Sequence, residues 1–293
     1  MTENYIGCNI RISKCGLKGS IEAAKNENAN FYQIYLKSPQ STKGPRQKKE
    51  DLIFVNKELN KNKMKLVVHA SYMLNFCNPP DSFIHKHAIK SLKNDLEDSI
   101  TIGAIGVIVH MGKNVKKLKL TNQEAQDNFV IGIKNVLNNS PKDSIIIFET
   151  GAGQGSEICT SIVDLGKLYR CFDENEKKRI TFCLDTCHMF SAGYDLSNIN
   201  YLGFFEEHIE VNLGWNNVSC IHLNDSQKEL NCHLDRHEDL GFGFIDLKGL
   251  SEFVRMCIKR NIPIVLETPV KNKDKNNELF SYKKQIELIK TWL

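Results

Sequence analysis

Six short apolar runs of the chain end in a histidine or a carboxylate. These residues are His69 after LVV, His110 after GVIV, Glu149 after IIIF, Asp185 after TFCL, His222 after CI and Glu267 after PIVL. Three further candidates, His188, Asp235 and His237, follow two of these runs closely. Zinc readily binds imidazole nitrogen and carboxylate oxygen, and nine such groups are too many for one tetrahedral ion. We therefore predict a site for two or three metal ions.

Each candidate ligand taken alone has an ordinary structural interpretation. A histidine at a strand end is more often a hydrogen-bonded structural residue, and a carboxylate there can cap a helix or pair with lysine. Independent coincidences of that kind would not place a potential ligand at the end of six successive runs. The combined pattern therefore favours a metal centre.

The elements that must position these residues follow from the same runs. The runs are rich in β-branched residues and predict eight strands, at residues 5–12, 31–36, 65–69, 105–110, 144–149, 180–185, 218–223 and 262–267. Segments with helical spacing lie between them, as at 88–102, 122–137, 162–171, 247–259 and 280–293. Alternating strands and helices predict a parallel sheet, and eight units predict one (β/α)8 (TIM) barrel domain over residues 1–293. The strand ends would then converge on one face.

Composition restricts the class of protein. The 293 residues are 41% hydrophobic and 25% charged, which excludes a disordered chain, and the net charge of +4 is too small to indicate nucleic-acid binding by itself. No run of about 18 apolar residues predicts a membrane span, and the sequence MTENYIGCNI does not resemble a signal peptide. We expect a soluble intracellular monomer, whose compartment, cytoplasm or nucleus, the sequence does not determine.

The ten cysteines include no CxxC pair, which argues against a disulfide framework or a zinc finger. Cys183 and Cys187 lie close to His188 and could be mistaken for a thiolate zinc site. Strand alternation places Cys183 on the same side as Asp185, while Cys187 falls in the loop after the strand. We predict core packing for Cys183 and no catalytic role for either thiol.

Several longer blocks resemble the endonuclease IV family of metal-dependent abasic-site endonucleases. The blocks are HASYMLN (69–75), ETGAGQGSEI (149–158), CLDTCHMFSAGYDL (183–196), HLND (222–225), DRH (235–237), LGFG (240–243) and LET (266–268). The similarity extends over nearly the whole chain. The chain departs from the family pattern with HMG at 110–112, Asn9 in place of a common histidine and Phe242 in LGFG.

The resemblance implies a set of ligands for three zinc ions, with manganese as an alternative at some sites. His69 and His110 would bind the first ion, and Glu149 would bridge it to the second. Asp185, His222 and Glu267 would complete the second ion, and His188, Asp235 and His237 would hold the third. A metal-bridging hydroxide would be the nucleophile, with Glu149 and Glu267 as catalytic residues.

The resemblance also implies a substrate, double-stranded DNA containing abasic sites. The enzyme would hydrolyse the phosphodiester 5′ to the lesion, leave a 3′-hydroxyl, and trim blocked 3′ ends. Tyr72 and Met73 would be inserted into the DNA beside the lesion, although Tyr72 could instead pack on the following helix. Basic residues between Lys37 and Lys49 would contact phosphates, unless this segment is only a solvated loop.

Three alternatives remain open at this point. A metal-dependent sugar isomerase or epimerase on the same barrel also gathers histidines and carboxylates at strand ends, but with fewer histidines and no third ion. A non-catalytic scaffold would not retain so complete a ligand set. A nuclease for ultraviolet photoproducts is disfavoured by the GAGQGS and AGYDL blocks.

Overall fold

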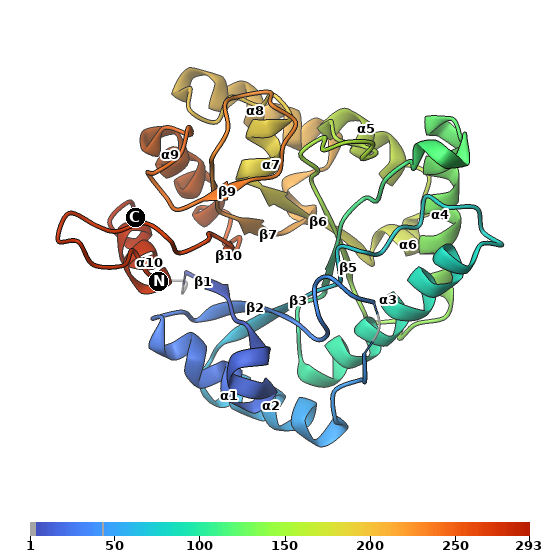
Figure 1. The fold of residues 1–293 in the computed structure, drawn as a ribbon, viewed down its shortest axis with the longest axis horizontal. Coiled ribbons are helices and arrows are strands. Elements are labelled where there is room, and N and C mark those ends of the chain that lie inside the picture. Colours follow the sequence, from blue (N-terminus) through green and yellow to red (C-terminus); the bar gives the residue numbers. More distant parts are fainter. Residues whose placement is uncertain (1–3, 43) are drawn as a thin grey trace.

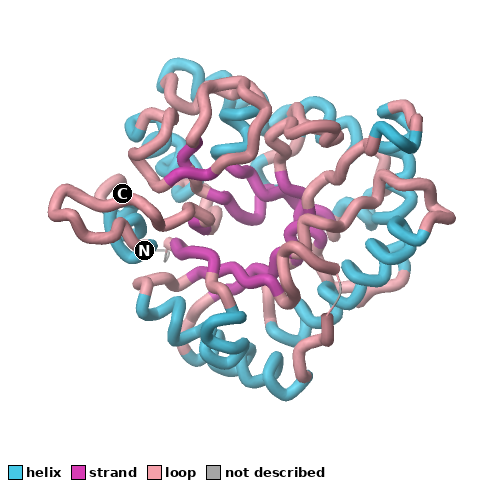
Figure 2. Tube along the Cα trace, viewed as in Figure 1, coloured by secondary structure: helices cyan, strands magenta, loops and turns pink. Residues whose placement is uncertain are grey.

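A computed structural model describes residues 4–42 and 44–293. In these ranges eight parallel strands close into a barrel in the order β1-β10-β7-β6-β5-β4-β3-β2, with helices around it (Figures 1 and 2). The strands are β1 Ile6–Asn9, β2 Phe31–Tyr35, β3 Lys65–His69, β4 Val107–Val109, β5 Ile146–Glu149, β6 Ile180–Asp185, β7 Val218–His222 and β10 Ile264–Leu266. The predicted (β/α)8 barrel is confirmed, and each predicted strand region contains one of these strands.

The helices cover the outside of the barrel, and α10 lies beside β1 (Figure 1). They are α1 Ile12–Asn26, α2 Lys49–Lys61, α3 Phe83–Ile102, α4 Asn122–Asn138, α5 Ile162–Tyr169, α6 Glu174–Lys177, α7 Thr186–Ser191, α8 Ile199–Asn212, α9 Leu247–Ile258 and α10 Tyr282–Lys290, with 3-10 turns η1 Lys116–Leu118 and η2 Trp215–Asn217. No helix in the described part of the chain is long and apolar enough to span a membrane.

Local sequence signals start and end several of these helices. Ser82 caps α3 by accepting a hydrogen bond from the backbone of His85, and Gly103 ends α3 in the left-handed conformation. Thr121 and Glu124 form a reciprocal capping box at the start of α4. These caps fix the start of α3 and α4 and the end of α3.

An apolar layer of side chains lies inside the barrel below the strand ends. This floor layer consists of Phe31, Val67, Ile108, Ile147, Cys183, Cys220 and Val265, all fully buried. It is separate from the larger core between the strands and the helices. Cys183 therefore packs in the barrel interior, as the strand alternation predicted.

A two-stranded ribbon follows β7, formed by β8 Asp225–Ser226 and β9 His237–Glu238. The carboxylate of Asp225 accepts hydrogen bonds from the backbone of Gly241 at 3.0 Å, Gly243 at 2.9 Å and Ile245 at 2.9 Å. These bonds hold the LGFG loop against the ribbon and bring the DRH segment over the barrel mouth.

Candidate metal centre

The predicted ligands on the strands form a ring directly above the floor layer. Because side chains alternate along a strand, the residue two positions after each floor residue faces the same interior. At the ends of β3 to β7 and of β10 these residues are the six predicted ligands, and on β2 the equivalent residue is Gln33. We call these seven residues the mouth ring: Gln33, His69, His110, Glu149, Asp185, His222 and Glu267.

The mouth ring and the adjoining loops contain overlapping sets of possible ligand atoms. Within each set these atoms lie within 4.8 Å of one another, and the sets are His69, His110 and Glu149; Glu149, Asp185, His222 and Glu267; and Asp185, His188 and His237. Asp235 and His237 form a further set with Cys187. All nine predicted ligands are thus brought together at the carboxyl ends of the strands.

Glu149 lies at the centre of the first two sets and is 1% exposed. Its Oε2 atom is 3.1 Å from Nε2 of His69 and 3.2 Å from Nε2 of His110, while Oε1 is 2.9 Å from Nδ1 of His222. One carboxylate oxygen therefore faces each of the two sets, which is the arrangement that a bridging ligand requires.

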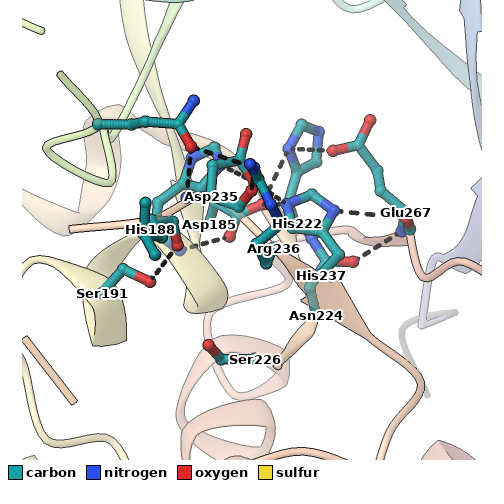
Figure 3. Close-up of polar contacts among 12 residues, drawn as sticks. Asp185, His188, Ser191, His222, Asn224, Ser226, Asp235, Arg236, His237 and Glu267 are labelled. Atoms are coloured by element: carbon teal, nitrogen blue, oxygen red, sulfur yellow. Dashed lines mark hydrogen bonds and ion pairs between the residues drawn. The ribbon is translucent and has the colours of Figure 1, made fainter. Parts of the chain in front are cut away.

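The second set is held in place by hydrogen bonds from the HLND segment (Figure 3). The Asn224 side chain donates to Oδ2 of Asp185 at 2.8 Å and accepts from the backbone of Glu267 at 2.9 Å. Oε2 of Glu267 lies 3.1 Å from Nδ1 of His222. Asn224 thereby fixes two predicted ligands that come from different strands.

The third set joins the start of α7 to the ribbon (Figure 3). Asp185 caps α7 by accepting from the backbone of His188 at 2.9 Å, which points this turn into the site. Nε2 of His188 and Nε2 of His237 each lie 3.2 Å from Oδ1 of Asp235. Residues from two segments therefore converge on one oxygen atom.

Mutual charge interactions shift the pKa values of these groups in the absence of metal. Burial alone would lower the pKa of His222, but the carboxylates of Glu267 and Glu149 outweigh burial and raise it well above its ordinary value. Burial would raise the pKa of Glu149, but His110 and His222 hold it well below its usual range. A protonated His222 thus balances the carboxylates of the second set in the metal-free protein.

The residues fit divalent metal ions on structural grounds. Nε2 of His188 and Nε2 of His237 are buried and make no hydrogen bond to any described residue, although Asp235 is close to both. Such orphaned nitrogens are costly unless a ligand satisfies them. The mixture of imidazole and carboxylate donors is suited to zinc.

Hydrogen bonds on the far side of several rings orient them. Nδ1 of His69 lies 2.6 Å from the carbonyl of Ala70, and Nδ1 of His188 lies 2.8 Å from the carbonyl of Thr150. In both cases the backbone accepts a proton and leaves Nε2 directed at the centre, as is usual for metal-binding histidines. Tyr35 adds a stacked ring 4.7 Å from the ring of His69.

A cavity of about 630 Å³ opens directly over the metal centre. Its lining includes Glu149, His188 and Glu267 at the bottom and Tyr72 and Met73 at the side. Tyr72 is 44% exposed and Met73 is 55% exposed. This exposure weighs against the alternative in which Tyr72 packs on the following helix.

Two of the basic residues predicted to contact phosphates, in the segment between Lys37 and Lys49 after β2, form ion pairs within the protein. The ammonium of Lys37 is nearly buried and lies 2.8 Å from Asp95 of α3, and Arg46 pairs with Glu97 and Asp98 of the same helix. Both cations are engaged with carboxylates of α3, and burial leaves Lys37 little surface for a phosphate, so phosphate contact by this segment stays a prediction. Residue 43 lies outside the described residues.

The prediction that Cys187 lies in a loop is wrong, because the residues after Asp185 turn directly into helix α7, which contains Cys187. Its sulfur shares a possible ligand set with Asp235 and His237. Burial raises the pKa of the Cys187 thiol to about 12, so the thiol is neutral in the metal-free protein. Sequence reasoning also missed Gln33 and Asn224, which contact the predicted ligands.

The fold and the site together define a TIM barrel with a candidate metal centre at its mouth. A family model described as a xylose isomerase-like TIM barrel matches residues 21–292. A protein of Acanthamoeba polyphaga mimivirus named as an endonuclease 4 is 40% identical over 292 residues, covering 98% of this chain and 93% of the relative. One from Staphylococcus carnosus is 34% identical, covering 98% and 95%.

A solved structure agrees with these relatives. The crystal structure of endonuclease IV from Thermus thermophilus superimposes with a TM-score of 0.80 at 24% identity, covering 98% of both chains. The chain belongs to the endonuclease IV family. It is a nuclease of a metal-dependent DNA-repair family, and the alternative of a sugar isomerase is not favoured.

Proposed function

We propose that the protein cuts duplex DNA on the 5′ side of abasic sites and leaves a 3′-hydroxyl, using three zinc ions. The observation that carries this proposal is the convergence of nine donor residues in overlapping sets beneath one open cavity. His69, His110 and Glu149 would hold the first ion, and Glu149 would also reach the second. The family relationship supports the reaction class.

The remaining ligands divide between the second and third ions. Asp185, His222 and Glu267 would complete the second, and His188, Asp235 and His237 would hold the third. When bound, the ions would supply a hydroxide nucleophile at neutral pH and positive charge that stabilises the transition state and the leaving oxygen. Manganese would be the alternative ion at some of these sites.

Residues of the chain itself would perform the remaining tasks. Glu149 would contribute one carboxylate oxygen to each of the first two ions, and Glu267, held by Asn224 through its backbone, would orient the nucleophile. Tyr72 and Met73 lie exposed at the side of the cavity and would fill the gap left by the missing base. A missing base makes it easier to turn the sugar out of the helix, which contributes selectivity.

A cleavage assay tests this proposal directly. The substrate is a duplex oligonucleotide with one tetrahydrofuran abasic analogue, incubated with zinc-loaded protein, chelator-treated protein and the Glu149→Gln variant. We expect one incision 5′ of the analogue by the loaded protein and none by the other two. A Glu252→Gln variant, changed on the outer surface of α9, serves as the matched control and should cut normally.

Two finer parts of the proposal need their own measurements. A duplex with a blocked 3′ end should be trimmed by the same protein, and loss of trimming in Glu149→Gln would assign it to the same site. Light scattering of the purified protein would test the expected monomer. Incision of undamaged and abasic duplexes at equal rates would contradict the proposed substrate.

A further inference from the structure

We propose that Gln33 is a positioning residue that orients His222 and Glu267 for the second metal ion, an inference that rests on the proposed metal centre. Gln33 lies in the middle of β2 and is fully buried. Its Oε1 atom is 2.8 Å from Nε2 of His222, and its Nε2 atom is 2.6 Å from Oε1 of Glu267. One amide therefore links two proposed ligands from β7 and the segment after β10.

The chemistry of the three groups determines the direction of both hydrogen bonds. The Glu267 carboxylate can only accept, so the amide nitrogen of Gln33 must donate to it. The amide oxygen then faces His222 and can only accept, so Nε2 of His222 must carry a proton. In the neutral ring Nδ1 then carries no proton, so its lone pair is free to bind a metal ion.

Nδ1 is the nitrogen of His222 that faces the site. It lies 2.9 Å from Oε1 of Glu149, 3.1 Å from Oε2 of Glu267 and 3.6 Å from Oδ2 of Asp185. A histidine must bind a metal ion as the neutral ring, through the nitrogen that lacks a proton. Gln33 therefore selects the tautomer that the second ion requires.

His222 differs in this respect from three of the other proposed histidine ligands. His69, His188 and His237 direct Nε2 at carboxylates of the site, and their Nδ1 atoms lie near backbone carbonyls of Ala70, Thr150 and Glu267. The corresponding acceptor for His222 is the side chain of another strand. A single substitution can remove that acceptor, which makes its contribution measurable.

The same amide also restrains Glu267. Oε1 of Glu267 accepts from Gln33 while Oε2 faces Nδ1 of His222, so the carboxylate presents one defined oxygen to the centre. Figure 3 shows the side chain of Glu267 directed toward His222. Partners of this kind typically alter metal affinity or activity by about 10–100-fold when they are mutated.

The test uses Gln33→Met, which preserves length and removes both hydrogen bonds. Zinc binding is measured by titration against a chelator of known affinity, counting ions per chain. We expect the affinity for one ion to fall by about 10–100-fold while the others stay tight. Gln285→Met is the matched control, because Gln285 is equally buried and hydrogen-bonded but contacts none of the nine ligands.

Nuclear magnetic resonance of the zinc-loaded protein provides a readout that a merely structural role would not change. The Nε2 proton of His222 should be protected from exchange in the wild type and in Gln285→Met, and should exchange rapidly in Gln33→Met. Gln33→Glu keeps an acceptor opposite Nε2 but loses the donor to Glu267, so it should retain the protected proton while zinc binding weakens. This variant keeps the test valid if the methionine variant does not fold.

Unchanged zinc affinity together with a protected proton in Gln33→Met would overturn the inference. Loss of the proton in a folded Gln33→Glu variant would also contradict it. These measurements do not depend on DNA cleavage. Weakened zinc binding in Gln33→Met with no incision by the zinc-loaded wild type would uphold the role of Gln33 and refute the proposed substrate.

Discussion

Nε2 of His237 lies 3.2 Å from Oδ1 of Asp235, and this buried nitrogen makes no hydrogen bond to any residue in the described ranges. Burial would lower the pKa of His237, but the carboxylates of Asp185 and Asp235 raise it to about 9. The pair is therefore an ion pair in the metal-free protein. When zinc binds, the metal must displace the proton from His237.

This relationship predicts how the stability of the metal-free protein depends on pH. Because the pKa of His237 is higher in the folded state than in the unfolded state, its protonated ring stabilises the folded protein. This stabilisation is complete below about pH 6.5 and is lost as the pH rises to about 9. We expect His237 to contribute about 3 kcal/mol to the free energy of unfolding at the lower pH, and this contribution should disappear as the pH rises to 9. Urea unfolding in the presence of a chelator, between pH 6 and pH 9.5, measures it.

The control for the pH measurement is His237→Asn, which lacks the titrating ring. The difference in unfolding free energy between wild type and variant should shrink as the pH rises. A difference that stays constant from pH 6 to pH 9.5 would show that His237 carries no extra proton. Zinc-loaded wild type should lack this pH dependence.

The third ion should depend on Asp235 and not on the nearby thiol. Asp235→Ala removes the oxygen shared by two histidines, so we expect two tightly bound zinc ions per chain in place of three. Cys187→Ala is the matched control and should retain three, because burial raises the pKa of the thiol to about 12 and makes its deprotonation costly, whereas His188, Asp235 and His237 already supply three donors. Zinc content after dialysis against a weak chelator measures both. Loss of an ion in the cysteine variant would make Cys187 a ligand.

Removing the side chains at the side of the cavity should weaken lesion recognition and leave the metal centre intact. Tyr72→Ala and Met73→Ala should each reduce binding of an abasic duplex by about tenfold, since one stacking contact contributes ~1–3 kcal/mol. Fluorescence anisotropy with abasic and undamaged duplexes measures the effect. Phe83→Ala, at a residue 75% exposed and outside the cavity lining, should bind normally. Equal losses for both duplexes would argue against contact with the lesion.

The Lys37–Asp95 ion pair should matter for stability. Both side chains are less than 10% exposed, so Lys37→Met leaves a buried carboxylate without its cation. We expect a loss of about 3–5 kcal/mol in unfolding free energy at neutral pH. Because burial already raises the pKa of Asp95, the loss should become smaller as the pH falls and Asp95 takes up a proton. Lys48→Met, at an exposed position, should change stability little.

The barrel strands were easier to predict from the sequence than the short elements that follow them. The eight barrel strands follow from apolar runs that alternate with helical segments, and the strand-end ligands follow from where those runs stop. The ribbon of β8 and β9 was not predicted, because two-residue strands leave no periodic signal. The helix at Thr186–Ser191 was also not identified, since it is too short to show a helical pattern.

Gln33 illustrates a signal that was present in the sequence but not used. It stands two residues after Phe31, as His69 stands two residues after Val67, and it is the one polar residue within the FYQIY strand apart from tyrosine hydroxyls. Gln33 was not identified, because only residue types that bind zinc directly were considered. The engagement of Lys37 with Asp95 had no comparable signal, because it joins two segments 58 residues apart.

The floor layer beneath the mouth ring has a consequence for how this enzyme can change over evolution. The strands from β2 onward in the barrel each contribute one residue to the apolar layer and, two positions later, one residue to the ring, so folding and chemistry depend on different positions of the same strand. A substitution in the ring can remove a ligand or introduce one without disturbing the layer below. The set of functional groups at the mouth can therefore change one strand at a time while the barrel keeps its fold.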